Sequence, residues 1–147
     1  MSDPTERRPG RREARQVNPA TIFVTLALAV IPPGVLVNPA VTQPNLQTTV
    51  CRPGWTATQR HVSARTKTAI YVAAGIPTSR RRYWVIDHVI PLEIGGSNNR
   101  ANLAAQRVAE AARKDVYENR AHRAVRAGRV TLIDAQAAFA TDWRTFR

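Results

Sequence analysis

An aspartate and a histidine, Asp87 and His88, stand side by side at the end of an apolar stretch of the sequence. A carboxylate is a ligand that hard divalent cations such as Mg²⁺ and Mn²⁺ favour. A neutral imidazole is suited to taking a proton from water near pH 7. Without further context such a pair is more often structural than functional. The residues around it therefore decide whether it indicates chemistry.

The residues that follow the pair form a longer pattern, because positions 87–103 read DHVIPLEIGGSNNRANL. In order and spacing these residues resemble the core of HNH endonucleases. The pattern of that family is D-H-(I/V)-x-P-L-x-x-G-G-S, followed by a gap of variable length and then by N-L. A looser similarity to the ends of small bacterial and phage HNH-like proteins extends from Lys114-Asp115 to Asp142-Trp143. The context favours a functional role for Asp87 and His88.

The resemblance implies a ββα-metal domain, in which two antiparallel strands and a helix hold one divalent metal ion. It also implies hydrolysis of phosphodiester bonds in nucleic acid, with DNA expected ahead of RNA and both left open. By resemblance Asp87 is a metal ligand, His88 is the general base, and Asn102 holds the loop and helps to orient the histidine. Mg²⁺ or Mn²⁺ is the expected ion, with Zn²⁺ or Ni²⁺ as alternatives. Such an ion would neutralise the phosphate and stabilise the leaving oxygen.

The second metal ligand is where the match to the family weakens. The family usually places a His or Asn on the helix after the second strand, whereas eight residues after Asn102 this chain has Glu110, and the next histidine is His122. We predict Glu110 as this ligand, with Asp115 as the reserve. If neither carboxylate reaches the metal, the domain is a degenerate scaffold that binds nucleic acid without cutting it.

The charge balance indicates a polyanionic partner. Lys and Arg number 22 against 10 Asp and Glu, which gives a formal net charge of +12. Nucleic acid and anionic lipid are the usual partners of such a surface. We expect the basic residues nearest the site to contact phosphate: Arg80, Arg81, Arg82, Arg113 and Lys114. A membrane-associated accessory protein whose arginines meet anionic lipid is the alternative.

The site needs strands and a helix to position it, and the sequence predicts them. Residues 83–89 (YWVIDHV) are β-branched and aromatic, which favours a strand, and a shorter strand is predicted at 103–106. Neighbouring residues of a regular strand point to opposite faces, so a bend or bulge is needed to bring Asp87 and His88 into one cleft. Residues 91–101, with Gly, Ser and Asn, form a loop.

The remaining elements are helices. Residues 107–127 are rich in Ala, Arg and Glu and predict a long helix that ends at Gly128. Ser63 is predicted to cap a helix to about Ala74, and Thr131 with Asp134 to begin a last helix. The predicted class is α+β, with an HNH-like ββα core and flanking helices in a domain of residues 61–147, preceded by irregular linker at 41–60.

The N-terminal region is predicted to direct the chain to a membrane. Residues 1–19 read as a disordered basic leader, and residues 20–40 as a signal peptide or membrane anchor. The uncharged run is shorter than the roughly 20 residues of a spanning helix, which favours a signal peptide. The best cleavage site, after Ala40, matches poorly, so an anchor through residues 20–37 stays an alternative. The preceding arginines predict a secreted or anchored domain outside the cytoplasm.

Overall fold

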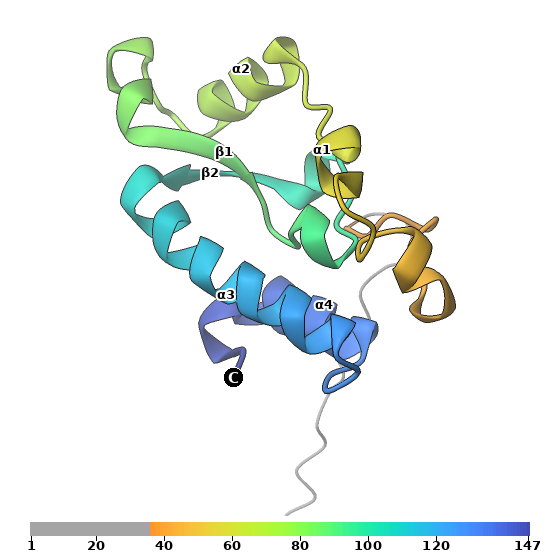
Figure 1. Cartoon of the computed structure of the whole chain (residues 1–147). Coiled ribbons are helices and arrows are strands. Elements are labelled where there is room, and N and C mark those ends of the chain that lie inside the picture. The colour runs from red at the N-terminus through yellow and green to blue at the C-terminus, as the bar shows by residue number, and fades with distance from the viewer. Residues whose placement is uncertain (1–35) are drawn as a thin grey trace, which may run out of the picture.

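The computed structural model describes residues 36–147, which form an α+β fold (Figure 1). Its elements are η1 (Gln43–Thr48), α1 (Trp55–Gln59), α2 (Ala64–Ala73), η2 (Thr78–Tyr83), β1 (Trp84–His88), η3 (Leu92–Ile94), η4 (Arg100–Asn102), β2 (Leu103–Arg107), α3 (Val108–Arg126), α4 (Leu132–Asp142) and η5 (Trp143–Thr145), where η marks a short 3-10 helix. In Figure 1, α2 lies above the two strands, and α3 and α4 lie below them.

The predicted leader at 1–19 and most of the predicted signal or anchor segment at 20–40 lie outside the described residues. Within residues 36–147, no helix is long and apolar enough to cross a membrane.

The two strands that carry the candidate residues pair as an antiparallel ladder. The register runs without interruption from Trp84 opposite Arg107 to His88 opposite Leu103. Both strands were predicted from the sequence, and the structure confirms them. Of the expected bend or bulge, the bulge is absent from these paired positions. The chain instead leaves the ladder directly after His88, where the amide of Val89 still donates to the carbonyl of Asn102 at 2.7 Å.

The helices also begin and end where the sequence predicts. The side chain of Ser63 accepts a hydrogen bond from the amide of Thr66 and caps α2. The Thr131 hydroxyl does the same for the amide of Asp134 at the start of α4. The long helix α3 ends just before Gly128, which has the left-handed φ of 67° that glycine tolerates best.

Residues 41–60, predicted as a linker, are instead part of the folded domain. This segment forms η1 and α1, and Leu46, Val50 and Trp55 are buried in the core. It is also fastened to the far end of the chain, because the Leu132 amide donates to the Gln43 side chain at 2.7 Å. The predicted domain start at residue 61 is therefore too late. The apolar residues of this segment follow neither a helical nor a strand period, so the pattern gave no signal.

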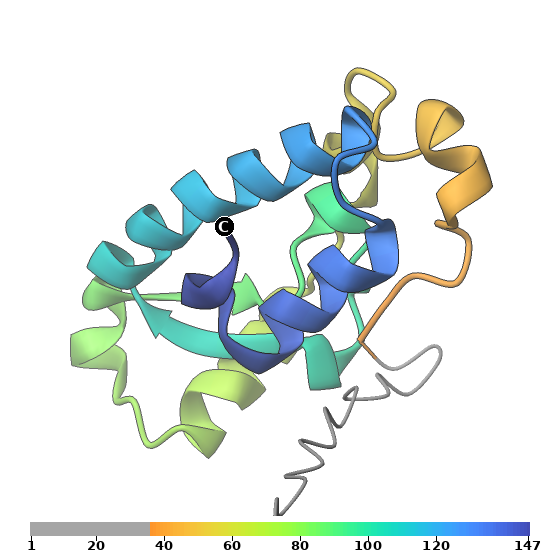
Figure 2. The same ribbon diagram turned by 90° about the horizontal axis from the view of Figure 1, so that it is seen from below.

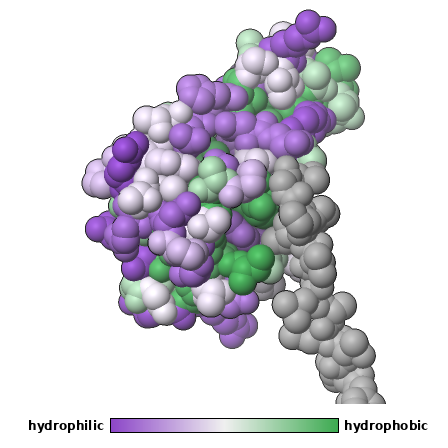
Figure 3. All heavy atoms as spheres, turned by 90° about the vertical axis from the view of Figure 1, so that its right-hand side faces the viewer, coloured by the Kyte–Doolittle hydropathy of each residue, from purple (hydrophilic) through white to green (hydrophobic). Residues whose placement is uncertain are grey.

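The core lies between this segment, the loop after β1, and the helices α3 and α4. Figure 2 shows α3 and α4 next to each other on one side of the strands. The buried cluster contains Val41, Leu46, Val50, Cys51, Trp55, Ile90, Ile94, Ala121, Ala124, Val125, Leu132, Ala135, Phe139 and Phe146. On the face seen in Figure 3, hydrophobic residues are scattered among hydrophilic ones and form no single continuous area.

The first described residues pair with the loop that follows β1. Val37 forms an antiparallel bridge with Gly96, the amide of Asn38 donates to the Gly95 carbonyl at 2.8 Å, and the amide of Ser97 donates to Leu36 at 3.0 Å. The last residues of the predicted anchor, 36 and 37, are therefore a structural part of the domain.

The close approach at Gly96 leads to a stability prediction. A Cβ atom added there would lie 1.8 Å from the carbonyl oxygen of Ile90, which is backbone and has no room to yield. We expect Gly96→Ala to lower the free energy of unfolding by about 3 kcal/mol or more in urea titrations. Gly75→Ala is the control, since nothing lies within 4 Å of its added Cβ and only its φ of 65° opposes alanine. Equal losses in the two variants would contradict the prediction.

Candidate functional site

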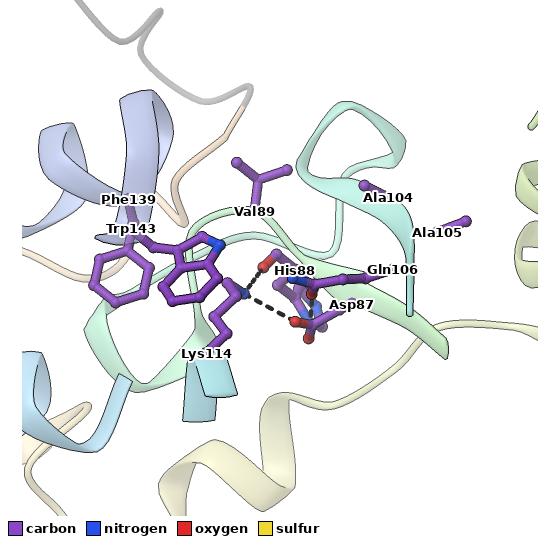
Figure 4. Close-up of a pocket in the computed structure, with 9 residues that line it drawn as sticks. All are labelled: Asp87, His88, Val89, Ala104, Ala105, Gln106, Lys114, Phe139 and Trp143. Atoms are coloured by element: carbon purple, nitrogen blue, oxygen red, sulfur yellow. Dashed lines mark hydrogen bonds and ion pairs between the residues drawn. The ribbon is translucent and has the colours of Figure 1, made fainter. Parts of the chain in front are cut away.

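The carboxylate of Asp87 lies at the end of β1 and faces α3. One oxygen, Oδ1, accepts from the amide of His88 at 2.9 Å, and the other, Oδ2, accepts from the ammonium of Lys114 at 2.9 Å. These residues line a hollow of about 190 Å³ whose other walls include Phe139 and Trp143 (Figure 4). The Asp87 carboxylate is thus held by two hydrogen bonds and still reaches solvent, because its side chain is 23% exposed.

Lys114 occupies the centre of the site. Its Nζ donates to Oδ2 of Asp87, to Oε1 of Glu118 at 2.7 Å and to the carbonyl oxygen of His88 at 2.5 Å. An ammonium has three protons to donate, and all three are used here. The side chain is only 3% exposed. The expectation that Lys114 contacts a phosphate therefore does not hold in this conformation, because the ammonium is buried and already satisfied.

Glu118 is the second carboxylate of the site, and sequence reasoning missed it. It lies one helical turn after Lys114 on α3, and its side chain is 13% exposed. Burial raises the pKa of Glu118 to about 7; the Lys114 charge and hydrogen bond oppose the rise, and the charges of Asp87 and Glu93 add to it. Near neutral pH Glu118 is therefore partly protonated.

This shift predicts a pH dependence of stability. The folded pKa of Glu118 lies above its ordinary value of 4.5, so the folded chain binds more protons than the unfolded chain between those limits. Its contribution to stability is therefore full below about pH 4.5 and is lost as the pH rises through about 7. Glu118→Gln should remove this fall, which is on the order of 2 kcal/mol.

The measurement is urea unfolding at pH 5 and pH 8 for the native chain and the variant. Glu110→Gln is the matched control, because Glu110 lies on the same helix with its side chain 31% exposed. Identical pH dependence in the native chain and Glu118→Gln would refute the assignment.

The imidazole of His88 is held in one orientation by Asn98. Nε2 of His88 lies 2.9 Å from Oδ1 of Asn98, whose Nδ2 donates to the carbonyl oxygen of Gln59 at 2.5 Å. A carbonyl only accepts, so the amide nitrogen of Asn98 must face Gln59 and its oxygen must face the ring. The neutral imidazole therefore carries its proton on Nε2. Nδ1 is left as the nitrogen that accepts a proton.

The surroundings of His88 favour its neutral form. The residue is 6% exposed, and burial is the largest cause of a pKa below the ordinary value. The hydrogen bond to Asn98 and the charge of Asp87 raise the pKa, while the charges of Arg60 and Lys114 lower it further. The net lowering keeps the imidazole neutral near pH 7, the state that a general base requires. These mutual charges also show that Asp87, His88 and Lys114 form one electrostatic cluster.

Asn102 closes the loop between the strands. It is 0% exposed, its Nδ2 donates to the carbonyl oxygens of Ile90 and Ser97, both at 2.9 Å, and its Oδ1 accepts from the Ile90 amide at 2.8 Å. All of these bonds go to loop backbone. The asparagine that contacts His88 is Asn98, which lies four residues earlier in the Gly-Gly-Ser-Asn-Asn run and was not predicted.

Neither of the predicted helix ligands contacts Asp87. Glu110 lies one turn before Lys114 on the same face of α3, and its carboxylate pairs with Arg144. Asp115 is exposed. The spacing from Asn102 therefore led to the correct face of α3, the face that carries Lys114 and Glu118. It pointed to a residue one helical turn before Lys114. Within residues 36–147, no group of three or more His, Cys, Asp or Glu side chains is arranged to hold a metal ion.

The predicted phosphate-contacting arginines lie apart from this cluster. Arg81 stacks over Tyr71 and Arg82 over Tyr83, next to the first residue of β1, while Asp87 and His88 end that strand. Arg107 covers Trp84 at the same end. Arg80 is exposed beside them, whereas exposed Arg113 lines a separate hollow on α3. The structure thus gathers an arginine and aromatic surface at one end of the sheet and the carboxylates at the other.

No family model, curated protein or solved structure matches the chain. The oxygen atoms around Lys114 Nζ indicate which kind of ion could bind at the site. Two carboxylate oxygens and one carbonyl oxygen surround a single point at 2.5–2.9 Å, and a cation, the ammonium of Lys114, stands at that point. Such oxygens are the donors that Mg²⁺, Mn²⁺ and Ca²⁺ take in proteins. The donor set suits a divalent ion if Lys114 withdraws.

Proposed function

We propose that this chain is a metal-dependent endonuclease of the HNH kind, which hydrolyses phosphodiester bonds in nucleic acid, with DNA as the first substrate to test. One observation carries the proposal. Oxygens of Asp87, Glu118 and the His88 backbone converge on a single cation position, directly beside a histidine that its surroundings keep neutral. The antiparallel strands followed by a helix, with Asn102 closing the loop between them, agree with this scaffold.

Each residue has a distinct part in the proposed reaction. Asp87 and Glu118 would hold the metal ion, which when bound supplies charge neutralisation at the phosphate and the leaving oxygen. Nδ1 of His88 takes a proton from the attacking water, because Nε2 is committed to Asn98. Asn98 is a positioning residue for the ring, and Asn102 holds the loop from which Asn98 reaches it.

The basic surface supplies affinity in this proposal. The net charge of +12 and the exposed arginines Arg80, Arg82 and Arg113 provide contacts that a phosphate backbone neutralises without regard to sequence. Tyr83, 48% exposed beside Arg82, offers a face on which a base can stack. A membrane role and an extracytoplasmic location stay predictions about residues outside the described part of the chain.

A second candidate function is favoured by the position of Lys114. If its three hydrogen bonds are permanent, the carboxylates are never available, and the domain is a scaffold that binds nucleic acid without cutting it. The two candidates make opposite statements about divalent metal in the reaction.

The deciding experiment incubates the full chain with supercoiled plasmid in Mg²⁺, Mn²⁺, Zn²⁺ or Ni²⁺, with and without a chelator. The endonuclease requires nicking that depends on metal and is at least about 100-fold slower in Asp87→Asn. Asp115→Asn, an exposed carboxylate on α3, is the matched control and should nick normally. DNA binding without nicking in any of the four metals would instead establish the scaffold.

A further inference from the structure

The cation position at the centre of the site is filled by the chain itself. Lys114 Nζ meets Asp87, Glu118 and the His88 carbonyl at 2.5–2.9 Å, so each donor oxygen of the site is turned toward this ammonium. We propose that these three oxygens form a binding site for a divalent cation, and that the ammonium of Lys114 occupies this site and competes with the divalent ion for it. The inference rests on the proposed function for the identity of the ion, but metal binding alone tests it.

Simultaneous occupation by the ammonium and a metal ion is excluded. The three oxygens face one point, and a divalent ion at that point would meet an ammonium within bonding distance in a buried site, where water screens repulsion poorly. A metal ion therefore binds only when Lys114 leaves. The free protein is expected to take up Mg²⁺ or Mn²⁺ weakly, because each binding event first breaks three hydrogen bonds to a charged donor.

The structure also provides a place for the displaced side chain. Lys114 borders the hollow of about 190 Å³ beside the site, and Figure 4 shows its side chain between the Asp87 carboxylate and the aromatic pair Phe139 and Trp143. The Phe139 ring centre already lies 6.0 Å from Nζ. Aromatic faces attract ammonium groups, and the flexible lysine stem allows the move. A phosphate that entered this hollow would be a further partner for the released ammonium.

Manganese titration of the full chain without nucleic acid tests the inference. Lys114→Met keeps the apolar stem and removes the charge. It should bind Mn²⁺ at least about tenfold more tightly than the native chain, which is a shift of about 1.4 kcal/mol. Lys114→Met combined with Glu118→Gln should lose this gain. Lys67→Met is the matched control, because Lys67 is the other lysine of the chain and is exposed on α2.

Each outcome of the titration is informative. Equal Mn²⁺ affinity of the native chain and Lys114→Met would overturn the inference, as would a folded Lys114→Met that binds no Mn²⁺. If Lys114→Met is unfolded without metal, circular dichroism replaces the titration: refolding by Mn²⁺ supports the inference, and no refolding overturns it. Tight Mn²⁺ binding by Lys114→Met together with a native chain that never nicks DNA would leave this inference standing and remove the proposed nuclease function.

Discussion

Replacing His88 by alanine is expected to slow the metal-dependent nicking of supercoiled DNA by a factor of about 10² to 10⁴, the usual contribution of a general base. The imidazole is the neutral base of the proposed site, and Asn98 fixes its tautomer so that Nδ1 accepts the proton. The rate constant for loss of supercoiled plasmid at saturating metal measures the effect. Because burial lowers the pKa of His88, protonation of this imidazole should not by itself limit nicking at the ordinary histidine value of 6.5.

The matched control for this variant is His61→Ala. His61 is exposed, lies two residues after the end of α1 and has no part in the proposed site, so its loss should leave the nicking rate within about twofold of the native value. Because the imidazole of His88 is buried, circular dichroism and thermal melting are needed to test whether His88→Ala still folds. Undiminished nicking by a folded His88→Ala would remove His88 from the mechanism, whatever metal the site holds.

Replacing Asn102 by alanine is expected to lower the free energy of unfolding by about 3 kcal/mol. The substitution removes three hydrogen bonds, which Asn102 makes to the amide and the carbonyl of Ile90 and to the carbonyl of Ser97. Ile90 is itself 0% exposed, so water reaches its backbone only if the loop opens. Urea unfolding measures the loss, and faster hydrogen exchange of the Ile90 amide would locate it.

Asn99→Ala is the control for Asn102→Ala. Asn99 is exposed and its side chain caps only the short helix η4, by accepting from the Ala101 amide. Its removal should cost about 1 kcal/mol or less. A loss as small as this in Asn102→Ala would show that the loop does not depend on the Asn102 bonds. Nicking by the folded fraction should fall as well, because Ser97 and Asn98 are on the same loop.

The elements of the fold were predictable where local signals act alone. The β-branched run at 83–89 and the caps at Ser63, Thr131 and Gly128 each fix a boundary through contacts within a few residues, and the structure has those boundaries. Residues 41–60 lack such signals. Their order comes from packing against α3 and α4, which are distant in sequence, so composition alone suggested a linker.

The candidate site was predictable only in part, for a related reason. The Asp87-His88 pair and Asn102 are recognisable because their spacing is local. The turn of α3 that meets Asp87 is set by where and at what angle the helix crosses the strands. The spacing of residues in the sequence gives neither the position nor the angle of that crossing. The one-turn spacing of Lys114 and Glu118 was visible in the sequence, but nothing local shows that this pair faces β1 rather than solvent.

The bridge between Val37 and Gly96 bears on how the chain can be processed. A peptidase that cut after Ala40 would remove the strand residue that pairs with Gly96, together with the bond from the Asn38 amide to Gly95. The mature protein would then begin at Val41, a core residue that is 6% exposed, and its charged amino group would lie at the edge of the core. Any maturation that preserves these contacts must therefore cut before Leu36.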